Sequence, residues 1–200
     1  MKGFDVSENN GYVDFAEAKA EGYDFVIVRC SYGQNGRDEM FLDNVNRAHD
    51  AGLLVGAYHY DYSMDEDDAY NNAMNCRAAI DEAGVLLELP VFYDMEDADG
   101  WKTNHGFLYD PEKITAMCKA FVDNIGLDCG VYASESWFRN YIDWQSLGCA
   151  VWNASWYSNP QEPCPGDGVD GICGYMWQYT DSAYIAGKQL DADYIYDSEG

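Results

Sequence analysis

The chain has few basic residues and no long apolar segment. Its 200 residues contain 11 Lys and Arg against 36 Asp and Glu, which gives a formal net charge of -25. Nucleic-acid binding requires a basic face, and adsorption to anionic lipid requires surface cations. No apolar run approaches the roughly 20 residues of a membrane-spanning helix. We therefore expect no nucleic-acid partner and no membrane partner, whereas a neutral polymer such as a glycan is compatible with this charge.

The sequence also lacks a metal-binding cysteine pattern and a leader at its start. No C-x-x-C pair occurs among the seven Cys, so we predict no zinc site, and we expect no other metal and no cofactor. Cys164 and Cys173 bracket a loop and could form a disulfide. Asp167 and Asp170 in that loop hint at calcium, but the full ligand pattern is missing. Residues 1–4 run directly into a strand pattern, so we expect no signal peptide.

The most informative stretch is an apolar strand that ends in two acids, Val91-Phe92-Tyr93-Asp94-Met95-Glu96. Its apolar run predicts a buried strand, because parallel strands covered on both faces lack strict alternation. Asp94 and Glu96 are two residues apart, so on a strand they point to the same side. Two like charges placed together hinder folding. A paired-carboxylate acid/base site explains them, and a hydrogen-bonded structural pair is the alternative.

Strand and helix patterns alternate along the chain. Strands are predicted over residues 2–6, 25–30, 54–60, 91–96, 129–133, 150–154, 174–179 and 190–196. Helices are predicted over residues 15–21, 38–51, 65–83, 111–125 and 135–142, with a loop over 101–110. This alternation indicates parallel β/α units, and eight strands indicate a closed barrel. The last three strands lack long helices between them, so the helical ring should be incomplete. We predict one α/β domain over residues 1–200, with residues 197–200 as a tail or the start of a linker.

Acidic and aromatic residues recur at the predicted strand ends. Barrel chemistry takes place at the C-terminal ends of the strands. We therefore expect Asp94 and Glu96 to share one cleft with Asp5 and Asp191, although Asp193 lies on the same strand face as Asp191. Six further residues near these ends are predicted to contact a sugar, with core packing as the alternative for the aromatic ones: Tyr58, Tyr60, Trp152, Tyr157, Trp177 and Gln178.

Several segments together resemble the signature blocks of glycoside hydrolase family 25, the Chalaropsis-type lysozymes of bacteria and their phages. These segments are GFDVS at 3–7, GAYHY at 56–60, YDME at 93–96, VWNASWY at 151–157, WQYT at 177–180 and LDADY at 190–194. The resemblance covers essentially the whole chain. It implies a TIM-like (β/α)5β3 barrel that hydrolyses the β-1,4 bond between N-acetylmuramic acid and N-acetylglucosamine in peptidoglycan. It also implies that Glu96 is the general acid, Asp94 its catalytic partner, and Asp5 and Asp191 two further cleft acids.

Glycoside cleavage needs a proton for the leaving oxygen and a negative charge near the oxocarbenium-like centre. We expect neighbouring anions to raise the pKa of Glu96, as a general acid requires, while Asp94 stays ionised. The flexible carboxyl groups of residues two apart on a strand could fall on either side of the separation that divides retaining from inverting enzymes. The sequence therefore leaves retention, inversion and substrate assistance open.

The prediction is thus a lysozyme, a 1,4-beta-N-acetylmuramidase whose partner is the glycan strand of peptidoglycan. We expect a monomer that acts on the bacterial cell wall, either outside the cell or after release from a host cytoplasm as a phage endolysin. A C-terminal wall-binding module could follow it. Two alternatives remain. A non-catalytic glycan-binding barrel is disfavoured by the intact set of acids, and a chitinase-like hydrolase by the absence of acids in residues 90–93.

Overall fold

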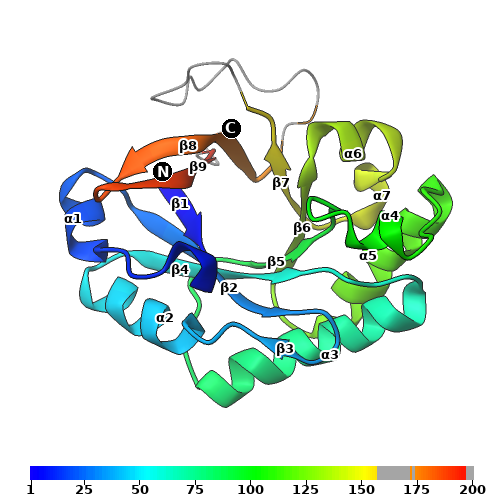
Figure 1. The fold of residues 1–200 in the computed structure, drawn as a ribbon, viewed down its shortest axis with the longest axis horizontal. Coiled ribbons are helices and arrows are strands. Elements are labelled where there is room, and N and C mark those ends of the chain that lie inside the picture. The colour runs from blue at the N-terminus through cyan, green and yellow to red at the C-terminus, as the bar shows by residue number, and fades with distance from the viewer. Residues whose placement is uncertain (157–171, 173, 197–200) are drawn as a thin grey trace.

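One sheet closes on itself to form the centre of the molecule (Figure 1). The computed structural model describes residues 1–156, 172 and 174–196. The strand order is β1-β9-β8-β7-β6-β5-β4-β2-β3, and pairing of β1 with β2 closes a ring of 8 strands from which β3 extends. The strands are β1 (Lys2–Val6), β2 (Phe25–Tyr32), β3 (Gly36–Arg37), β4 (Leu54–Tyr60), β5 (Val91–Asp94), β6 (Cys129–Ser134), β7 (Ala150–Ala154), β8 (Met176–Ile185) and β9 (Lys188–Ile195). The predicted closed barrel is confirmed.

Helices follow the first five strands of the ring. They are α1 (Phe15–Ala20), α2 (Phe41–Asp50), α3 (Glu66–Ala83), α4 (Trp101–Asn104), α5 (Pro111–Ile125), α6 (Glu135–Asn140) and α7 (Trp144–Leu147), with the 3-10 turn η1 (Glu8–Asn10) after β1. Figure 1 shows α1, α2, α3 and α5 around the outside of the barrel, whereas β8 and β9 form a hairpin at its upper edge. This arrangement is the predicted (β/α)5β3 barrel.

Local sequence signals set the ends of the two long helices. The Asp65 carboxylate accepts a hydrogen bond from the Asp68 backbone N–H (3.0 Å) at the start of α3. At the start of α5, Asp110 Oδ1 accepts from the backbone N–H groups of Glu112 and Lys113 (2.9 and 3.2 Å). These bonds satisfy donors that have no partner inside a helix. Gly84 and Gly126 end the two helices in the left-handed conformation (φ 62° and 68°).

Two of the differences between the predicted and the observed elements have identifiable reasons. Asp38 does not open α2, which begins at Phe41, because its carboxylate is buried and accepts a hydrogen bond from Arg29 Nε (2.9 Å). Part of the predicted loop over 101–110 is helix α4. Asp97 accepts the first-turn N–H groups of Lys102 and Thr103 (2.7 and 3.0 Å), which satisfies the donors that a short helix exposes.

The last strand runs against the direction of the others. β9 is antiparallel to both β1 and β8, with Asp5 opposite Asp191. Ala186 and Gly187 have positive φ values (46° and 74°), as two-residue hairpin turns require. The sequence reading took the barrel strands as parallel units. Reversal places Asp191, near the beginning of β9, at the barrel end where β1 and β5 finish.

The barrel interior and its outer layer hold different side chains. Alternate residues of the strands point inward, and the interior is filled by a cluster that includes Phe25, Ile27, Phe92, Trp152 and Met176. A Cβ at Gly130 would lie 2.7 Å from the Phe92 ring and 2.5 Å from the Ala150 carbonyl oxygen. The absence of a side chain at Gly130 therefore leaves space for the Phe92 ring in the barrel interior.

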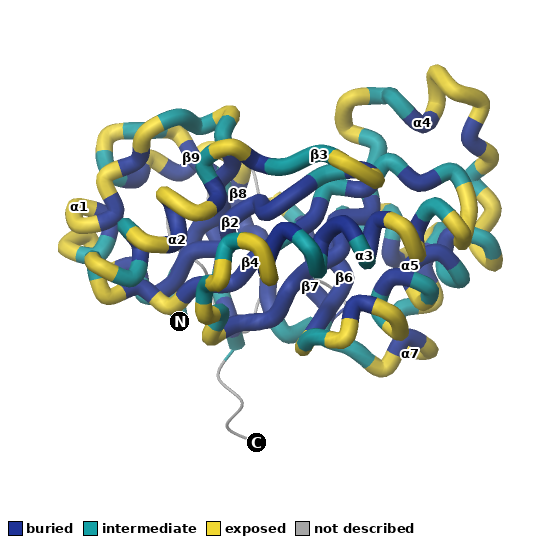
Figure 2. The backbone as a smooth tube through the Cα atoms, turned by 90° about the horizontal axis from the view of Figure 1, so that it is seen from below, coloured by how far each residue is buried: buried dark blue, intermediate teal, exposed yellow. Residues whose placement is uncertain are grey.

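The other strand faces pack against the helices. Figure 2 shows the strands as buried and the outward sides of the helices as exposed. The Tyr93 ring on β5, for example, stacks on Phe121 of α5 with ring centroids 4.1 Å apart. In the part of the chain that the structure describes, no helix combines the length and apolar character needed to cross a bilayer.

Removal of the α5 cap should weaken the fold by a measurable amount. We expect Asp110→Ala to lower the free energy of unfolding by about 1 kcal/mol, because the N–H groups of Glu112 and Lys113 lose their acceptor. Asp110→Asn keeps an acceptor oxygen and should stay close to the unmodified protein. Urea denaturation of the three proteins tests this. Equal losses in both variants would contradict a capping role.

Candidate active site

A cavity of about 150 Å³ opens at the barrel end where β1, β4 and β5 finish. The four predicted acids, Asp5, Asp94, Glu96 and Asp191, all line it. The rest of its wall consists of Ser7, Asn9, Arg29, Tyr58, Tyr60, Tyr132, Trp152 and Gln178. Segments from both ends of the chain therefore meet at one site.

Strand register brings these residues together. Tyr60 of β4 pairs with Asp94 of β5, Asp94 with Tyr132 of β6, and Tyr132 with Trp152 of β7. Residues in register on neighbouring strands point to the same face, so these four form one row around the wall. The prediction placed Glu96 on the strand, but β5 ends at Asp94 and Glu96 lies two residues beyond it. Met95 N–H still donates to the Tyr132 carbonyl (2.9 Å), which continues the strand pairing by one step.

Gln178 connects the acids contributed by β1 and β9. Its Nε2 donates to Asp5 Oδ2 (2.8 Å) and, at 3.5 Å, to Asp191 Oδ2. Its Oε1 accepts from Tyr132 OH (2.9 Å) and from Trp156 Nε1 (3.0 Å). The amide is thus occupied by protein groups and the side chain is 2% exposed. Gln178 therefore holds the acids in place, and because it also lines the cavity, its predicted sugar contact stays a prediction.

The ambiguity between Asp191 and Asp193 is resolved by the strand geometry. Asp191 lines the cavity, whereas Asp193 is fully buried. Asp193 Oδ1 accepts a hydrogen bond from Trp152 Nε1 (2.8 Å). Asp193 therefore holds the side chain of Trp152, which lines the cavity, and Asp191 is the one of the two acids that lines the cavity itself.

The predicted aromatic contacts divide into two groups. Tyr58, Tyr60 and Trp152 line the cavity, with the Tyr58 and Trp152 rings edge to face at 6.2 Å. Trp177 does not line it, which corrects the prediction. Because side chains alternate along β8, Gln178 points inward and Trp177 points to the outer layer. There its Nε1 donates to the Ser155 carbonyl (3.0 Å) and its ring packs on Tyr179.

Tyr157, the Cys164–Cys173 pair and the calcium hint at Asp167 and Asp170 all lie outside the described residues. Within them, no group of three or more His, Cys, Asp and Glu side chains could hold a metal ion. His59 faces the outer layer, between Ser31 Oγ and Asn72 Oδ1 (both 2.8 Å).

Sequence reasoning missed Arg29 and Tyr132. Arg29 Nε donates to Asp38 (2.9 Å) and its Nη2 donates to Glu8 (3.0 Å), so a buried cation reaches the acidic cavity with two carboxylate partners. A basic residue within the apolar run Phe25–Tyr32 was the signal that could have revealed it. Tyr132 lies on β6 directly opposite Asp94 of β5, so the strand register alone would have identified it as a cavity residue.

Burial is the main cause of the pKa shifts in the cavity. It raises the pKa of Glu96 to about 7, with Lys102 opposing and Asp191, Asp99 and Asp97 adding to the rise. The direction agrees with the prediction, but desolvation comes before the neighbouring anions as a cause. Burial likewise raises the pKa of Asp191 to about 6, with Asp181 adding to the rise. Burial and the nearby Asp191 and Asp193 raise the pKa of Asp5 well above its ordinary value.

Asp94 is not kept ionised by its surroundings as predicted. Burial and then Glu96 raise its pKa well above the ordinary value, while Lys102 and Arg29 oppose the rise. Its Oδ1 has no hydrogen-bond partner within the described part of the chain. Because the charge of Glu96 raises the pKa of Asp94, the two carboxyl groups titrate as a pair. The arrangement therefore favours one shared proton and one negative charge.

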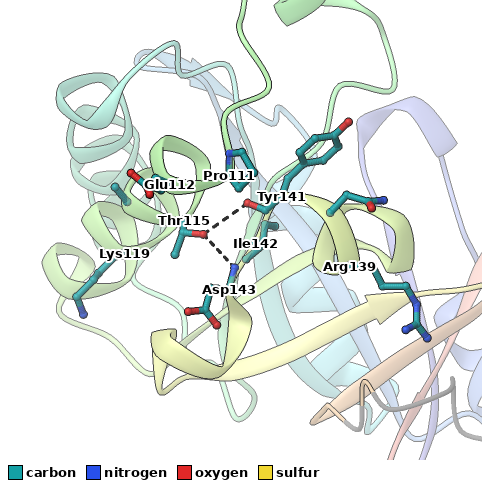
Figure 3. A pocket seen from close by; sticks show the side chains of 10 residues that line it. Pro111, Glu112, Thr115, Lys119, Arg139, Tyr141, Ile142 and Asp143 are labelled. Atoms are coloured by element: carbon teal, nitrogen blue, oxygen red, sulfur yellow. Dashed lines mark hydrogen bonds between the residues drawn. The ribbon is translucent and has the colours of Figure 1, made fainter.

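A larger groove of about 560 Å³ lies on the outer surface between α5 and the α6–α7 segment. Figure 3 shows Thr115 joining its two sides, accepting a hydrogen bond from Asp143 N–H (3.0 Å) and donating to the Tyr141 carbonyl (3.5 Å). Glu112 and Lys119 at this groove are solvent-exposed. It offers no pair of buried carboxyls, so the barrel cavity is the better candidate.

A (β/α)5β3 barrel with a pair of carboxyl groups at the end of its β5 strand, both in one cavity, has the architecture of a glycoside hydrolase. The sequence profile of Glycosyl hydrolases family 25 matches residues 4–188, and the chain belongs to this family. It is 33% identical over 219 residues to Lysozyme M1 of Streptomyces globisporus, covering 96% of this chain and 66% of that protein. It is 26% identical over 205 residues to the autolytic lysozyme of Clostridium acetobutylicum, covering 100% of this chain and 56% of that protein.

The chain thus spans between about half and two thirds of the length of these relatives. Among solved structures, the bacterial lysozyme of Streptomyces coelicolor superimposes with a TM-score of 0.75 at 21% identity. That match covers 100% of this chain and 93% of the other. The described part of the chain therefore has the same fold as this lysozyme.

The partly buried Glu96 should lower stability at high pH. Because the pKa of Glu96 is higher in the folded state, its contribution to stability is full below pH 4 to 5 and is lost as the pH rises through about 7. We expect Glu96→Gln to raise the free energy of unfolding at pH 8 by about 2 kcal/mol, with no gain at pH 4. Thermal unfolding at both pH values tests this. A gain of equal size at pH 4 would show that charge burial is not the cause.

Proposed function

We propose that residues 1–200 form the catalytic domain of a lysozyme that cleaves the β-1,4 bond between N-acetylmuramic acid and N-acetylglucosamine in peptidoglycan. The pair of buried Asp94 and partly buried Glu96, in a cavity with two further acids, is the observation that carries the proposal. Membership of glycosyl hydrolase family 25 supports the same substrate class.

Glu96 acts as the general acid. Glycoside cleavage requires a carboxyl group that is protonated near neutral pH and can transfer its proton to the leaving oxygen. Burial raises the pKa of Glu96 to about 7, so a protonated fraction is present at neutral pH. Glu96 is also less buried than Asp94, which suits a group that must reach the leaving oxygen.

Asp94 supplies the negative charge that complements Glu96. When Glu96 holds the shared proton, Asp94 is the anion, and Arg29 favours that distribution because it lowers the pKa of Asp94. The anion acts either directly on the oxocarbenium-like centre or by orienting the N-acetyl group of the substrate. Asp5 and Asp191, held by Gln178, add negative potential around the sugar.

Tyr58, Tyr60 and Trp152 form the aromatic part of the sugar-binding wall. We further propose that the domain acts as a monomer on the bacterial cell wall. The two curated relatives are longer than this chain, so wall targeting by a further module is part of this proposal for the whole protein.

Glu96→Gln should reduce lysis of purified cell walls by about 100-fold or more, because the variant has no proton to give to the leaving oxygen. The fold should remain intact, as circular dichroism can verify. Mass spectrometry of the digested wall identifies the bond that is cut and the sugar at the new end. Glu112→Gln, in the outer groove, is the matched control and should retain full activity.

Three outcomes would overturn this proposal. Near-normal lysis by Glu96→Gln would remove Glu96 from the chemistry. Binding of wall fragments by the unmodified protein, with no new reducing ends, would favour a non-catalytic glycan-binding barrel. Release of sugars from chitin but not from peptidoglycan would favour a chitinase-like hydrolase.

The two buried tryptophans should differ in their effects. Trp152→Phe alters the cavity wall and removes the donor to Asp193, so we expect KM for wall fragments to rise several-fold. Trp177→Phe lies in the outer layer and should lower the melting temperature with KM unchanged. Steady-state kinetics and thermal unfolding of both variants separate the two roles. A rise in KM confined to Trp177→Phe would restore Trp177 as a sugar contact.

A further inference from the structure

Lys102 is a fully buried cation beside the acid pair. It lies in α4 and is 1% exposed. Its Nζ is 3.1 Å from Asp61 Oδ2 and donates to the Asp61 carbonyl (2.8 Å). The same Nζ donates to the backbone carbonyl of Glu96. Burying an ammonium group is unfavourable unless it is paired and hydrogen-bonded, so all three contacts matter.

These contacts fasten the segment that carries Glu96. The chain leaves the barrel after β5, and Figure 2 shows α4 projecting beyond the strands before the chain returns to α5. Met95 N–H is bonded to Tyr132 on one side of Glu96, and Lys102 binds the Glu96 carbonyl on the other. Asp97 accepts from Lys102 N–H (2.7 Å) and from Tyr109 OH (2.7 Å), which holds the start of α4 in place.

Asp61 is held as firmly as its partner. Its Oδ1 accepts from the Ser63 backbone N–H (2.7 Å), and Asn72 Nδ2 lies 3.4 Å away. Asn72 in turn contacts Ser63 Oγ and His59 Nε2 (2.8 Å). The ion pair of Asp61 and Lys102 is therefore part of a buried polar network behind β4 and β5, with little freedom to move.

We propose that Lys102 is a positioning residue for the acid pair, which fixes the backbone at Glu96 and supplies the buried positive charge that allows one member of the pair to ionise. This inference rests on the proposed function only for its kinetic readout. It assigns a role to a side chain that does not line the cavity and would not touch the sugar.

Asp61 and the acid pair are the charged partners of Lys102, because the other titratable groups around it are neutral. His59 of β4, Tyr93 of β5 and Cys118 of α5 surround the same network. Burial lowers the pKa of His59 to about 4 and raises the pKa of Tyr93 and of Cys118 well above their ordinary values, so all three are neutral at neutral pH. Lys102 lowers the pKa of both Asp94 and Glu96, while Asp61 raises that of Asp94.

The acid pair itself faces further charged and titratable groups around the cavity. The acids Asp5 and Asp191 and the cation Arg29 come from β1, β9 and β2, and the phenols of Tyr58, Tyr60 and Tyr132 come from β4 and β6. Burial raises the pKa of all three phenols, so they stay neutral. Each of these groups is unchanged by substitutions at Lys102 and Asp61.

Opposite shifts of the pH profile test the proposal. Loss of a cation disfavours the anionic form of the pair, so in Lys102→Met both limbs of the profile of kcat for wall lysis should move to higher pH, by about 0.5 to 1 unit. Asp61→Asn removes the anion beside Lys102 and should move both limbs to lower pH. A role confined to holding the fold would lower kcat at every pH and leave the limbs in place.

The double variant Asp61→Asn with Lys102→Met keeps the test valid if the single Lys102→Met protein fails to fold, because it leaves no unpaired buried charge. Its profile should also move to higher pH, since Lys102 precedes Asp61 among the charges that act on Asp94. The exposed pair Lys119 and Asp123, changed to Met and Asn, is the matched control and should keep the original profile.

A substrate-free readout separates this inference from the proposed function. Carboxyl carbon-13 NMR titration of the pair in the unmodified, single and double variants measures the same shifts without any sugar. Shifted titration in a protein without lytic activity would overturn the proposed function and keep the role of Lys102. Titration and kcat profiles that coincide with those of the unmodified protein in Lys102→Met and in the double variant would overturn the role of Lys102.

Discussion

The pairing of β9 between β1 and β8 is the contact on which the site depends. It closes the ring, and it does so in the antiparallel sense, with Asp5 opposite Asp191. If β9 ran in the opposite direction, this antiparallel register, which sets Asp191 opposite Asp5, would be lost. Gln178 then joins the two closing strands through its amide, so the acids from the two ends of the chain are held by one side chain.

Four carboxyl groups close together in one cavity repel one another and oppose folding. Two buried cations, Arg29 and Lys102, offset part of this repulsion. Arg29 approaches the cavity from β2 with Asp38 and Glu8 as its own partners. Lys102 lies outside the cavity, where it donates to the backbone carbonyl of Glu96 and pairs with the carboxylate of Asp61. In a chain with only 11 basic residues, two of them are buried beside the acids. The remaining excess of negative charge lies mostly at the surface, where solvent screens it.

The sequence predicted the strands and the two long helices because their signals are local. Asp65, Asp110 and Pro111 mark helix starts without reference to the rest of the fold. Convergence of Asp5, Asp94, Glu96 and Asp191 was also predictable, since strand ends of a barrel share one rim. The direction of β9 was not, because one turn at residues 186–187 decides it. The burial of Lys102 was equally hidden, since an isolated lysine in a polar loop is usually a surface residue.

The incorrect prediction that Trp177 contacts the sugar also arose because local sequence does not show which face of a strand points inward. A motif such as WQYT gives neighbouring residues equal weight, whereas a strand separates them onto opposite faces. Only the position of Gln178 inside the barrel determines that Trp177 and Tyr179 are outside. The same alternation, once β6 was paired with β5, would have identified Tyr132 as part of the wall.

The two ends of the described chain meet on the side of the barrel away from the cavity. The Met1 ammonium group donates to the Ile195 carbonyl (2.8 Å), and the Ile195 N–H donates to the Met1 carbonyl (2.9 Å). These residues lie where β1 begins and β9 ends, whereas the acids lie where β1 ends and β9 begins. A polypeptide joined to the N-terminus would therefore emerge opposite the mouth of the cavity. Such a fusion could bring the domain to a surface while leaving the acids open to a long polymer chain.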